Sequence, residues 1–151
     1  MKEEDKKGIW EYCFPNTSAT EKDVILIEEQ LGIEIDKEIK EFWLHANGWN
    51  CFYQMVDLFG TEDMLSEKMN HAKELLSINL LYQDEFTMDQ LLPIAVSRDD
   101  MDIFASVISK NKEYGKVIWY AGGEIERFAS FKTFLSEMTK YCEQNMNDLN
   151  L

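Results

Sequence analysis

The order of the periodic segments limits what this chain can fold into more than any other feature of the sequence. Helix-like apolar spacing occurs in two successive segments near the N-terminus, in a third over residues 61–79, and in a last one over residues 130–144. Short apolar segments separated by polar turns lie between the third and the last. Strands joined by short turns pair antiparallel, whereas a parallel sheet needs a longer crossover. The sequence therefore predicts an α+β fold, an antiparallel β-sheet covered by helices.

The two N-terminal helices carry recognisable start and stop signals. The first, TEKDVILIEEQLG, begins at Thr20, which can form a weak capping box with Asp23, and Gly32 fits its stop. The second, IEIDKEIKEFWLHANG, has Asp36 as its N-cap candidate and is expected to end at Gly48, because glycine readily adopts the left-handed backbone of a helix stop. The expected buried faces consist of Val24, Ile27 and Leu31 in the first helix, and Ile39, Phe42, Trp43 and Ala46 in the second.

The middle of the chain predicts a strand, a helix and a β-hairpin. The alternation in CFYQMVDLF predicts one strand over residues 51–59, and TEDMLSEKMNHAKELLSIN predicts a helix over residues 61–79. The next segment, LLYQDEFTMDQ, is either a loop or a short helix. LLPIAVS and DIFASVIS flank the polar turn RDDM and therefore predict a hairpin. The inward residues expected for the helix are Leu65, Met69, Ala72 and Leu76.

The C-terminal part predicts a strand, a turn, a short strand and a helix. KVIWYAG is the first strand, and Gly122-Gly123 is a turn before ERFAS, since the acidic residues that follow the glycines would repel a phosphate. The final helix, SFKTFLSEMTKYCEQ, is expected to bury Phe131, Phe134, Leu135, Met138 and either Tyr141 or Cys142. Near the N-terminus, GIWEYCF is either a strand or a helical turn.

Size and composition predict a single cytoplasmic domain over residues 1–151. The 45% hydrophobic content supports a packed core. No apolar run approaches the roughly 20 residues that span a bilayer, and the first residues lack the apolar region of a signal peptide. The three cysteines include no C-x-x-C pair and are expected to be reduced.

The net charge of the chain limits the kinds of molecule that it is expected to bind. The chain has 29 acidic and 15 basic residues, a net charge of −14. Such a surface repels phosphate backbones and anionic lipid and attracts basic proteins. Nucleic acid and membrane are therefore not expected as partners. The alternative is that the charge only keeps the protein soluble.

No motif in the sequence predicts catalysis, a cofactor or a metal site. Phosphate-binding glycine loops, H-E-x-x-H and G-x-S-x-G are absent. The two histidines have no metal-ligand spacing, and the DDMD segment lacks the central glycine and distal glutamate of an EF-hand. The chain is therefore expected not to be an enzyme, although an enzyme of unrecognised type stays open.

Residues 20–48 resemble the start of the SUKH superfamily, which includes the yeast Smi/Knr cell-wall regulator and many bacterial immunity proteins. The resemblance consists of a helix ending in EEQLG, a short apolar link, and an aromatic-bearing helix ending in Asn-Gly. LLPIAVSRDDMDIFASVI and GKVIWYAGGEIERFASFKTFLSEM are similar to later blocks, so the resemblance covers residues 20–138. Two positions depart from the pattern: Ile35-Asp36 replaces a frequent Leu-Pro, and Met101 replaces a frequent glycine.

The resemblance implies an α+β domain without a catalytic site and a role in protein binding. Bacterial members are mostly cytoplasmic immunity proteins that bind and block a toxin encoded beside them, often a nuclease. This chain looks most like members paired with LXG toxins in Bacillus and relatives. The implied partner is a basic, nuclease-like C-terminal toxin domain. The alternative implied by the yeast relative is a regulatory adaptor that binds several proteins.

The candidate partner-binding residues are acidic residues in loops and three aromatic residues. Residues 84–102 contain six acids against one arginine, and loops carry binding residues more often than the solvated faces of helices do. Trp49 is either a lid over the core edge or an exposed anchor, and neighbouring Trp119 and Tyr120 point to opposite faces of their strand. The full set is Asp84, Glu85, Asp89, Asp99, Asp100, Asp102, Trp49, Trp119 and Tyr120.

Overall fold

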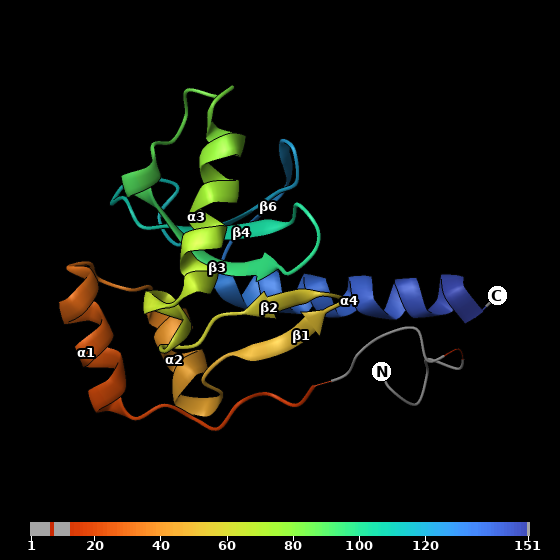
Figure 1. The fold of residues 1–151 in the computed structure, drawn as a ribbon, viewed down its shortest axis with the longest axis horizontal. Coiled ribbons are helices and arrows are strands. Elements are labelled where there is room, and N and C mark those ends of the chain that lie inside the picture. The colour runs from red at the N-terminus through yellow and green to blue at the C-terminus, as the bar shows by residue number, and fades with distance from the viewer. Residues whose placement is uncertain (1–6, 8–12, 151) are drawn as a thin grey trace.

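The computed structural model describes residue 7 and residues 13–150, and it confirms the predicted α+β fold (Figure 1). Six strands form one sheet in the order β1-β2-β3-β4-β5-β6, with every neighbouring pair antiparallel. The helices are α1 (Glu21–Leu31), α2 (Lys37–His45), α3 (Glu67–Leu80) and α4 (Phe131–Asn150), with short 3-10 helices η1 (Asp63–Leu65) and η2 (Met88–Gln90). The strands are β1 (Trp49–Tyr53), β2 (Val56–Leu58), β3 (Leu91–Ser97), β4 (Ile103–Val107), β5 (Val117–Tyr120) and β6 (Glu124–Phe128).

The long helices α3 and α4 cover opposite faces of the sheet (Figure 1). On α4, the Phe134 ring lies 5.7 Å from Phe52 on β1, 5.2 Å from Phe104 on β4 and 5.5 Å from Phe128 on β6, measured between ring centroids. Helix α3 contacts β3 and β4. Both faces of the central strands are therefore buried, which explains why all residues of β3 and β4 are buried.

The helix starts predicted from the sequence are confirmed. The Thr20 hydroxyl accepts a hydrogen bond from the Asp23 amide, and the Asp23 carboxylate accepts one from the Thr20 amide at 2.8 Å, which completes the capping box. The Asp36 carboxylate accepts from the Glu38 amide at 2.9 Å at the start of α2. Gly32 has the left-handed backbone of a stop, with φ of 66°. Local sequence alone specifies these ends because each contact lies within one turn.

The predicted role of Gly48 as the helix stop is wrong. Helix α2 ends at His45, with Ala46 in extended conformation as the C-cap. Gly48 does have a positive φ of 90°, but a Cβ added there would lie 2.6 Å from the Gly60 amide nitrogen. Next to it, the Asn47 side chain accepts from the Thr61 amide at 2.7 Å and donates to the Thr61 hydroxyl at 2.8 Å. The Asn-Gly pair therefore fastens the end of α2 to the segment after β2.

Two predicted element boundaries are also wrong. Residues 51–59 form a hairpin, not one strand: Gln54 has a positive φ of 53° and Tyr53 pairs with Val56. A two-residue turn leaves the apolar alternation nearly unbroken, so the pattern alone concealed it. The helix predicted over residues 61–79 begins only at Glu67, and Leu65 is 57% exposed in η1. The remaining predicted inward residues, Met69, Ala72 and Leu76, are buried.

The other predicted elements agree with the structure. The hairpin around RDDM is β3–β4, and Gly122-Gly123 is the turn between β5 and β6. The open choice for residues 80–90 resolves to the last residue of α3, a loop and then η2. On α4, Phe131, Phe134, Met138 and Cys142 are buried, while Leu135 and Tyr141 are partly buried against the core. The prediction for GIWEYCF falls mostly on residues 8–12, outside the described residues.

Candidate functional site

The six predicted acidic residues lie in two groups at opposite ends of β3. The loop acids, which precede the strand, are Asp84, Glu85 and Asp89. The turn acids, which follow it, are Asp99, Asp100 and Asp102. The strand has seven residues, and at about 3.3 Å per residue it separates the groups by roughly 20 Å. One small partner element cannot contact both groups at once.

The turn acids differ in exposure. Asp99 and Asp100 are exposed, and the Asp100 amide donates to the Ser97 hydroxyl at 3.0 Å. Asp102 is half-buried and accepts a hydrogen bond from the Trp119 indole N–H at 2.7 Å. Burial raises the pKa of Asp102 above its usual value, against the opposing effect of the Trp119 hydrogen bond. Asp102 therefore orients a core-edge tryptophan, which is a structural role.

The predicted aromatic anchors also make contacts within the chain. Trp49 is partly buried, and its indole N–H donates to the Cys13 carbonyl at 2.8 Å. Trp119 stacks on Phe104 with ring centroids 5.1 Å apart, on the α4 face of the sheet. Trp49 thus fits the lid reading better than the exposed-anchor reading. Tyr120 faces the other side, toward α3, as alternation along a strand requires.

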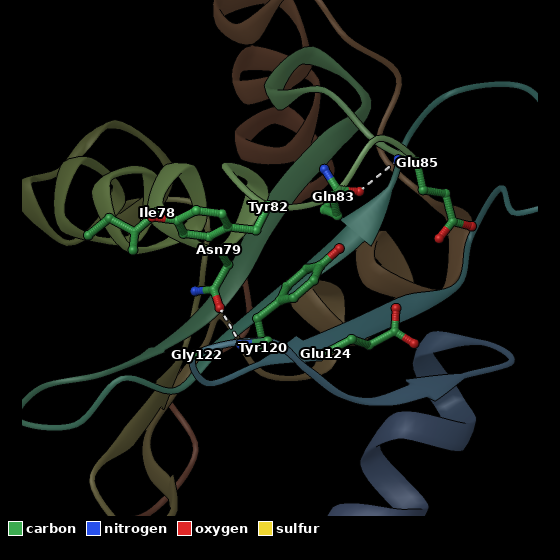
Figure 2. Close-up of a pocket in the computed structure, with 9 residues that line it drawn as sticks. Ile78, Asn79, Tyr82, Gln83, Glu85, Tyr120, Gly122 and Glu124 are labelled. Atoms are coloured by element: carbon green, nitrogen blue, oxygen red, sulfur yellow. Dashed lines mark hydrogen bonds between the residues drawn. The ribbon is translucent and has the colours of Figure 1, made fainter.

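A pocket of about 390 Å³ opens on that other side, between the end of α3, the loop that carries Glu85 and the β5–β6 turn (Figure 2). Tyr120 forms its base, and Tyr82 and Ile78 line one side. Glu85 and Glu124 line the side across from them (Figure 2). Among the described residues that line the pocket, none is basic.

Helix α3 is fastened to the β5–β6 turn at the pocket. The Asn79 side-chain oxygen accepts from the Gly123 amide at 2.9 Å (Figure 2). The side-chain nitrogen of Asn79 donates to the Leu75 carbonyl at 2.8 Å. Asn79 is buried. Both polar ends of this side chain are therefore satisfied, and they hold the helix end and the turn at a fixed separation.

The loop after α3 is organised by Gln83. Its side-chain oxygen accepts from the amides of Glu85 and Phe86, both at 2.9 Å, and its side-chain nitrogen donates to the Phe86 carbonyl at 2.7 Å. These bonds shape the loop, yet Tyr82 is 93% exposed beside them. A large aromatic side chain that projects from an ordered loop is typical of a protein-binding surface.

Arg127 on β6 holds the acidic side of the pocket in place. Its guanidinium donates to both carboxylate oxygens of Glu85, at 2.7 and 2.8 Å, and also to Glu124 and Glu113. The hydrogen bonds to Glu85 and Glu124 raise the pKa of Arg127, and the hydrogen bond from Arg127 lowers the pKa of Glu85. Lys116 pairs with Glu113 at 2.9 Å. The three carboxylates thus pair with Arg127 and Lys116, and the charge of Lys112 also acts on Glu85.

Tyr120 presents an unused hydroxyl to the pocket. The residue is only 3% exposed, and Figure 2 shows its hydroxyl directed toward the loop that carries Gln83 and Glu85. Within the described part of the chain, no hydrogen-bond partner is found for this hydroxyl. Burial, together with Glu124 and Glu85, raises the pKa of Tyr120 to about 12, so the group stays protonated.

Only part of this pocket was predictable from the sequence. Glu85 and Tyr120 were predicted to bind a partner, and they come together here, whereas Asp84 and Asp89 are exposed outside the lining. Tyr82, Asn79 and Arg127 were missed. The one available signal was Leu81-Tyr82, two apolar residues directly after a helix and outside its buried stripe.

Metal ligands and membrane-spanning helices are two other features that would indicate a function. In the residues that the structure describes, no group of three or more His, Cys, Asp or Glu side chains is arranged to hold a metal ion. No helix among residues 13–150 is both long enough and apolar enough to cross a membrane.

Comparison with known proteins places the chain in a family. No curated protein matches the sequence. The family model described as the SMI1 / KNR4 family (SUKH-1) matches residues 18–137. The matched segment runs from just before α1 into α4 and includes every strand and the pocket. It also agrees with the SUKH resemblance of residues 20–138. This protein therefore belongs to the SMI1/KNR4 family (SUKH-1).

Proposed function

We propose that this protein is a cytoplasmic immunity protein that binds a cognate toxin domain and neutralises it by sequestration, without catalysis. The observation that carries the proposal is membership of the SUKH-1 family, with which an immunity role is consistent. The proposed partner is the basic, nuclease-like C-terminal domain of an LXG-type toxin.

The charge of the molecule supports this partner. A nuclease needs a basic surface to hold a phosphate backbone, and a protein with net charge −14 is attracted to that surface and competes with nucleic acid for it. Opposite charges also speed association, which matters for an inhibitor that must act before its toxin does. The exposed acids at both ends of β3 contribute to this field.

The experiment is growth of cells that express the toxin domain encoded next to this gene, with and without this protein. Rescue of growth together with co-purification in a 1:1 complex is the expected result. A control expresses a toxin domain from an unrelated system, which this protein is expected not to neutralise. Absence of rescue by a demonstrably folded protein would overturn the proposal, and binding to several unrelated proteins would favour the adaptor alternative.

A further inference from the structure

We propose that the pocket between α3 and the β5–β6 turn binds an arginine side chain of the partner protein. This inference rests on the proposed function, in which the partner presents a basic surface. It goes further by naming the site on this protein and the group that enters it.

The base of the pocket offers a hydrogen-bond acceptor that is otherwise unused. The Tyr120 side chain is almost completely buried, its hydroxyl is directed into the pocket (Figure 2), and no partner for that hydroxyl is found among the described residues. The hydroxyl oxygen itself faces the open space of the pocket, since it is not among the buried unsatisfied atoms of the described residues. An N–H group inserted into the pocket could therefore donate to the phenol oxygen without displacing a hydrogen bond within the protein.

The wall beside Tyr120 selects for positive charge. Glu85 and Glu124 line the pocket, and their side chains are 51% and 40% exposed even with Arg127 bound to them. Each carboxylate oxygen has a second lone pair free for another donor. The described residues that line the pocket include these two carboxylates and no basic side chain, so an added cation would meet negative charge at this wall.

The opposite wall favours a guanidinium over an ammonium group. Tyr82 in this wall and Tyr120 at the base contribute two aromatic rings, and the carboxylates of Glu85 and Glu124 lie across from Tyr82. A guanidinium is planar, stacks on aromatic faces and spreads five donors in a fork, whereas a lysine ammonium is a compact, strongly hydrated charge. One arginine can therefore use the ring, the phenol oxygen and a carboxylate together.

The surroundings of the pocket indicate that the arginine belongs to a protein. Two lining side chains are exposed and apolar or aromatic, Ile78 at 49% and Tyr82 at 93%, and Leu81, next to Tyr82 in the sequence, is 70% exposed. These side chains offer apolar contact area next to the pocket, which a free small molecule inside it would leave uncovered. A protein surface that carries the arginine would cover them.

The walls are already in position before binding. Asn79 fixes α3 to the turn, Gln83 fixes the loop, and Arg127 fixes Glu85. A site with ordered walls loses little conformational entropy when it is filled.

The test is an NMR titration of the full-length, ¹⁵N-labelled protein with the capped peptide acetyl-Gly-Arg-Gly-amide. Chemical-shift changes are expected at the amides of Gly123, Tyr82 and Glu85, with saturation in the millimolar range because a single side chain provides the contacts. The same peptide with citrulline in place of arginine keeps the shape and removes the charge, and it is expected not to bind.

Two variants locate the binding energy. Tyr120→Phe removes only the unpartnered hydroxyl and is expected to weaken the arginine peptide about tenfold. Tyr82→Ala is expected to weaken it about two- to fivefold through loss of the ring. The matched control is Tyr53→Phe on the α4 face, which makes the same chemical change away from the pocket and is expected to leave affinity unchanged.

The outcomes separate this inference from the proposed function. Shifts confined to the pocket and lost with citrulline support the arginine site. Shifts elsewhere, equal binding of citrulline or lysine peptides, or an unaffected Tyr120→Phe variant would each overturn it, even if the wild-type protein rescues cells from the toxin. If the peptide binds as expected but rescue fails, the proposed function falls and the arginine site stands.

Discussion

The loop acids and the turn acids contain three acidic residues each at the two ends of one strand, but their surroundings differ. Beside the loop acids, Arg127 holds Glu85 against a pocket that also exposes tyrosine rings. In the turn, Asp102 is committed to Trp119 while Asp99 and Asp100 extend into solvent. Acidic residues in the two groups therefore have three different roles. Glu85 shapes a pocket, Asp102 orients a core residue, and Asp99 and Asp100 contribute to the long-range electrostatic field. The four predictions below test this difference.

The largest effect on stability is expected from Asp102→Lys. The change leaves the Trp119 N–H unpaired and places a cation in a half-buried position, so the free energy of unfolding should fall by about 2–3 kcal/mol. Urea denaturation measures it. Asp99→Lys is the matched control in the same turn and should stay within about 0.5 kcal/mol of wild type. Equal effects of the two changes would contradict the structural role of Asp102.

A smaller loss is expected from Arg127→Ala. This variant removes the group that pairs with Glu85, Glu113 and Glu124, so that the pair of Lys116 with Glu113 is the one ion pair of this cluster that remains among the described residues. The partly exposed network should contribute about 1–2 kcal/mol to the free energy of unfolding. Lys140→Ala, which breaks an exposed pair with Glu137, should leave the free energy of unfolding nearly unchanged, because exposed ion pairs contribute little. If both variants are equally stable, the cluster does not hold the loop.

Lowering the pH should change the contributions of Glu85 and Asp102 to the free energy of unfolding in opposite directions. The pKa of Glu85 is lowered by Arg127, so its stabilising contribution is present above its ordinary pKa of 4.5 and is lost as pH falls through the lower folded value. The pKa of Asp102 is raised by burial above 3.8, so the folded state takes up that proton first and gains stability as pH falls through the raised value.

Urea unfolding of wild type, Glu85→Gln and Asp102→Asn between neutral and acid pH tests this contrast. As the pH falls, the difference in free energy of unfolding between wild type and Glu85→Gln should shrink. Over the same range, the free energy of unfolding of wild type should rise relative to that of Asp102→Asn. If the free energy of unfolding depends on pH in the same way for all three proteins, protonation of neither Glu85 nor Asp102 is linked to folding.

The smallest effect is expected when Asp99 and Asp100 are both changed to Lys. Stability should not change, and association with the toxin domain should slow about two- to threefold at low salt, with dissociation unaffected. Stopped-flow kinetics at low and high salt provide the measurement. A faster dissociation rate would mean that the turn makes direct contact with the partner.

The fold was predictable where contacts are local in the chain. The capping box at Thr20 and the buried stripes of α1, α2 and α4 depend on neighbours within a few residues. The hairpin at Gln54 was not predicted, because a two-residue turn barely disturbs apolar alternation. The start of α3 was misplaced for a related reason, since the 3-10 turn of η1 has a helix-like composition.

The site was predictable only in part. The acidic residues and Tyr120 were predicted as partner-binding residues from their residue types. The sequence could not predict which of them are buried, paired or exposed. Asp102 is half-buried because β4 pairs with β5 in a register that brings Trp119 beside it. Tyr82 and Tyr120 line the same pocket, and Glu85 pairs with Arg127, because α3 packs on the sheet and brings the loop that follows it to β5 and β6.

The sequence by itself determined the class of fold, the caps of the first two helices and the acidic character of the surface, because periodicity, capping and charge are properties of a residue and its near neighbours. Only the tertiary structure decided that Gly48 is needed for close approach to Gly60, and that the acids form two groups. It also formed the pocket around the Tyr120 hydroxyl. Those features depend on strand register and helix packing, which bring together residues tens of positions apart.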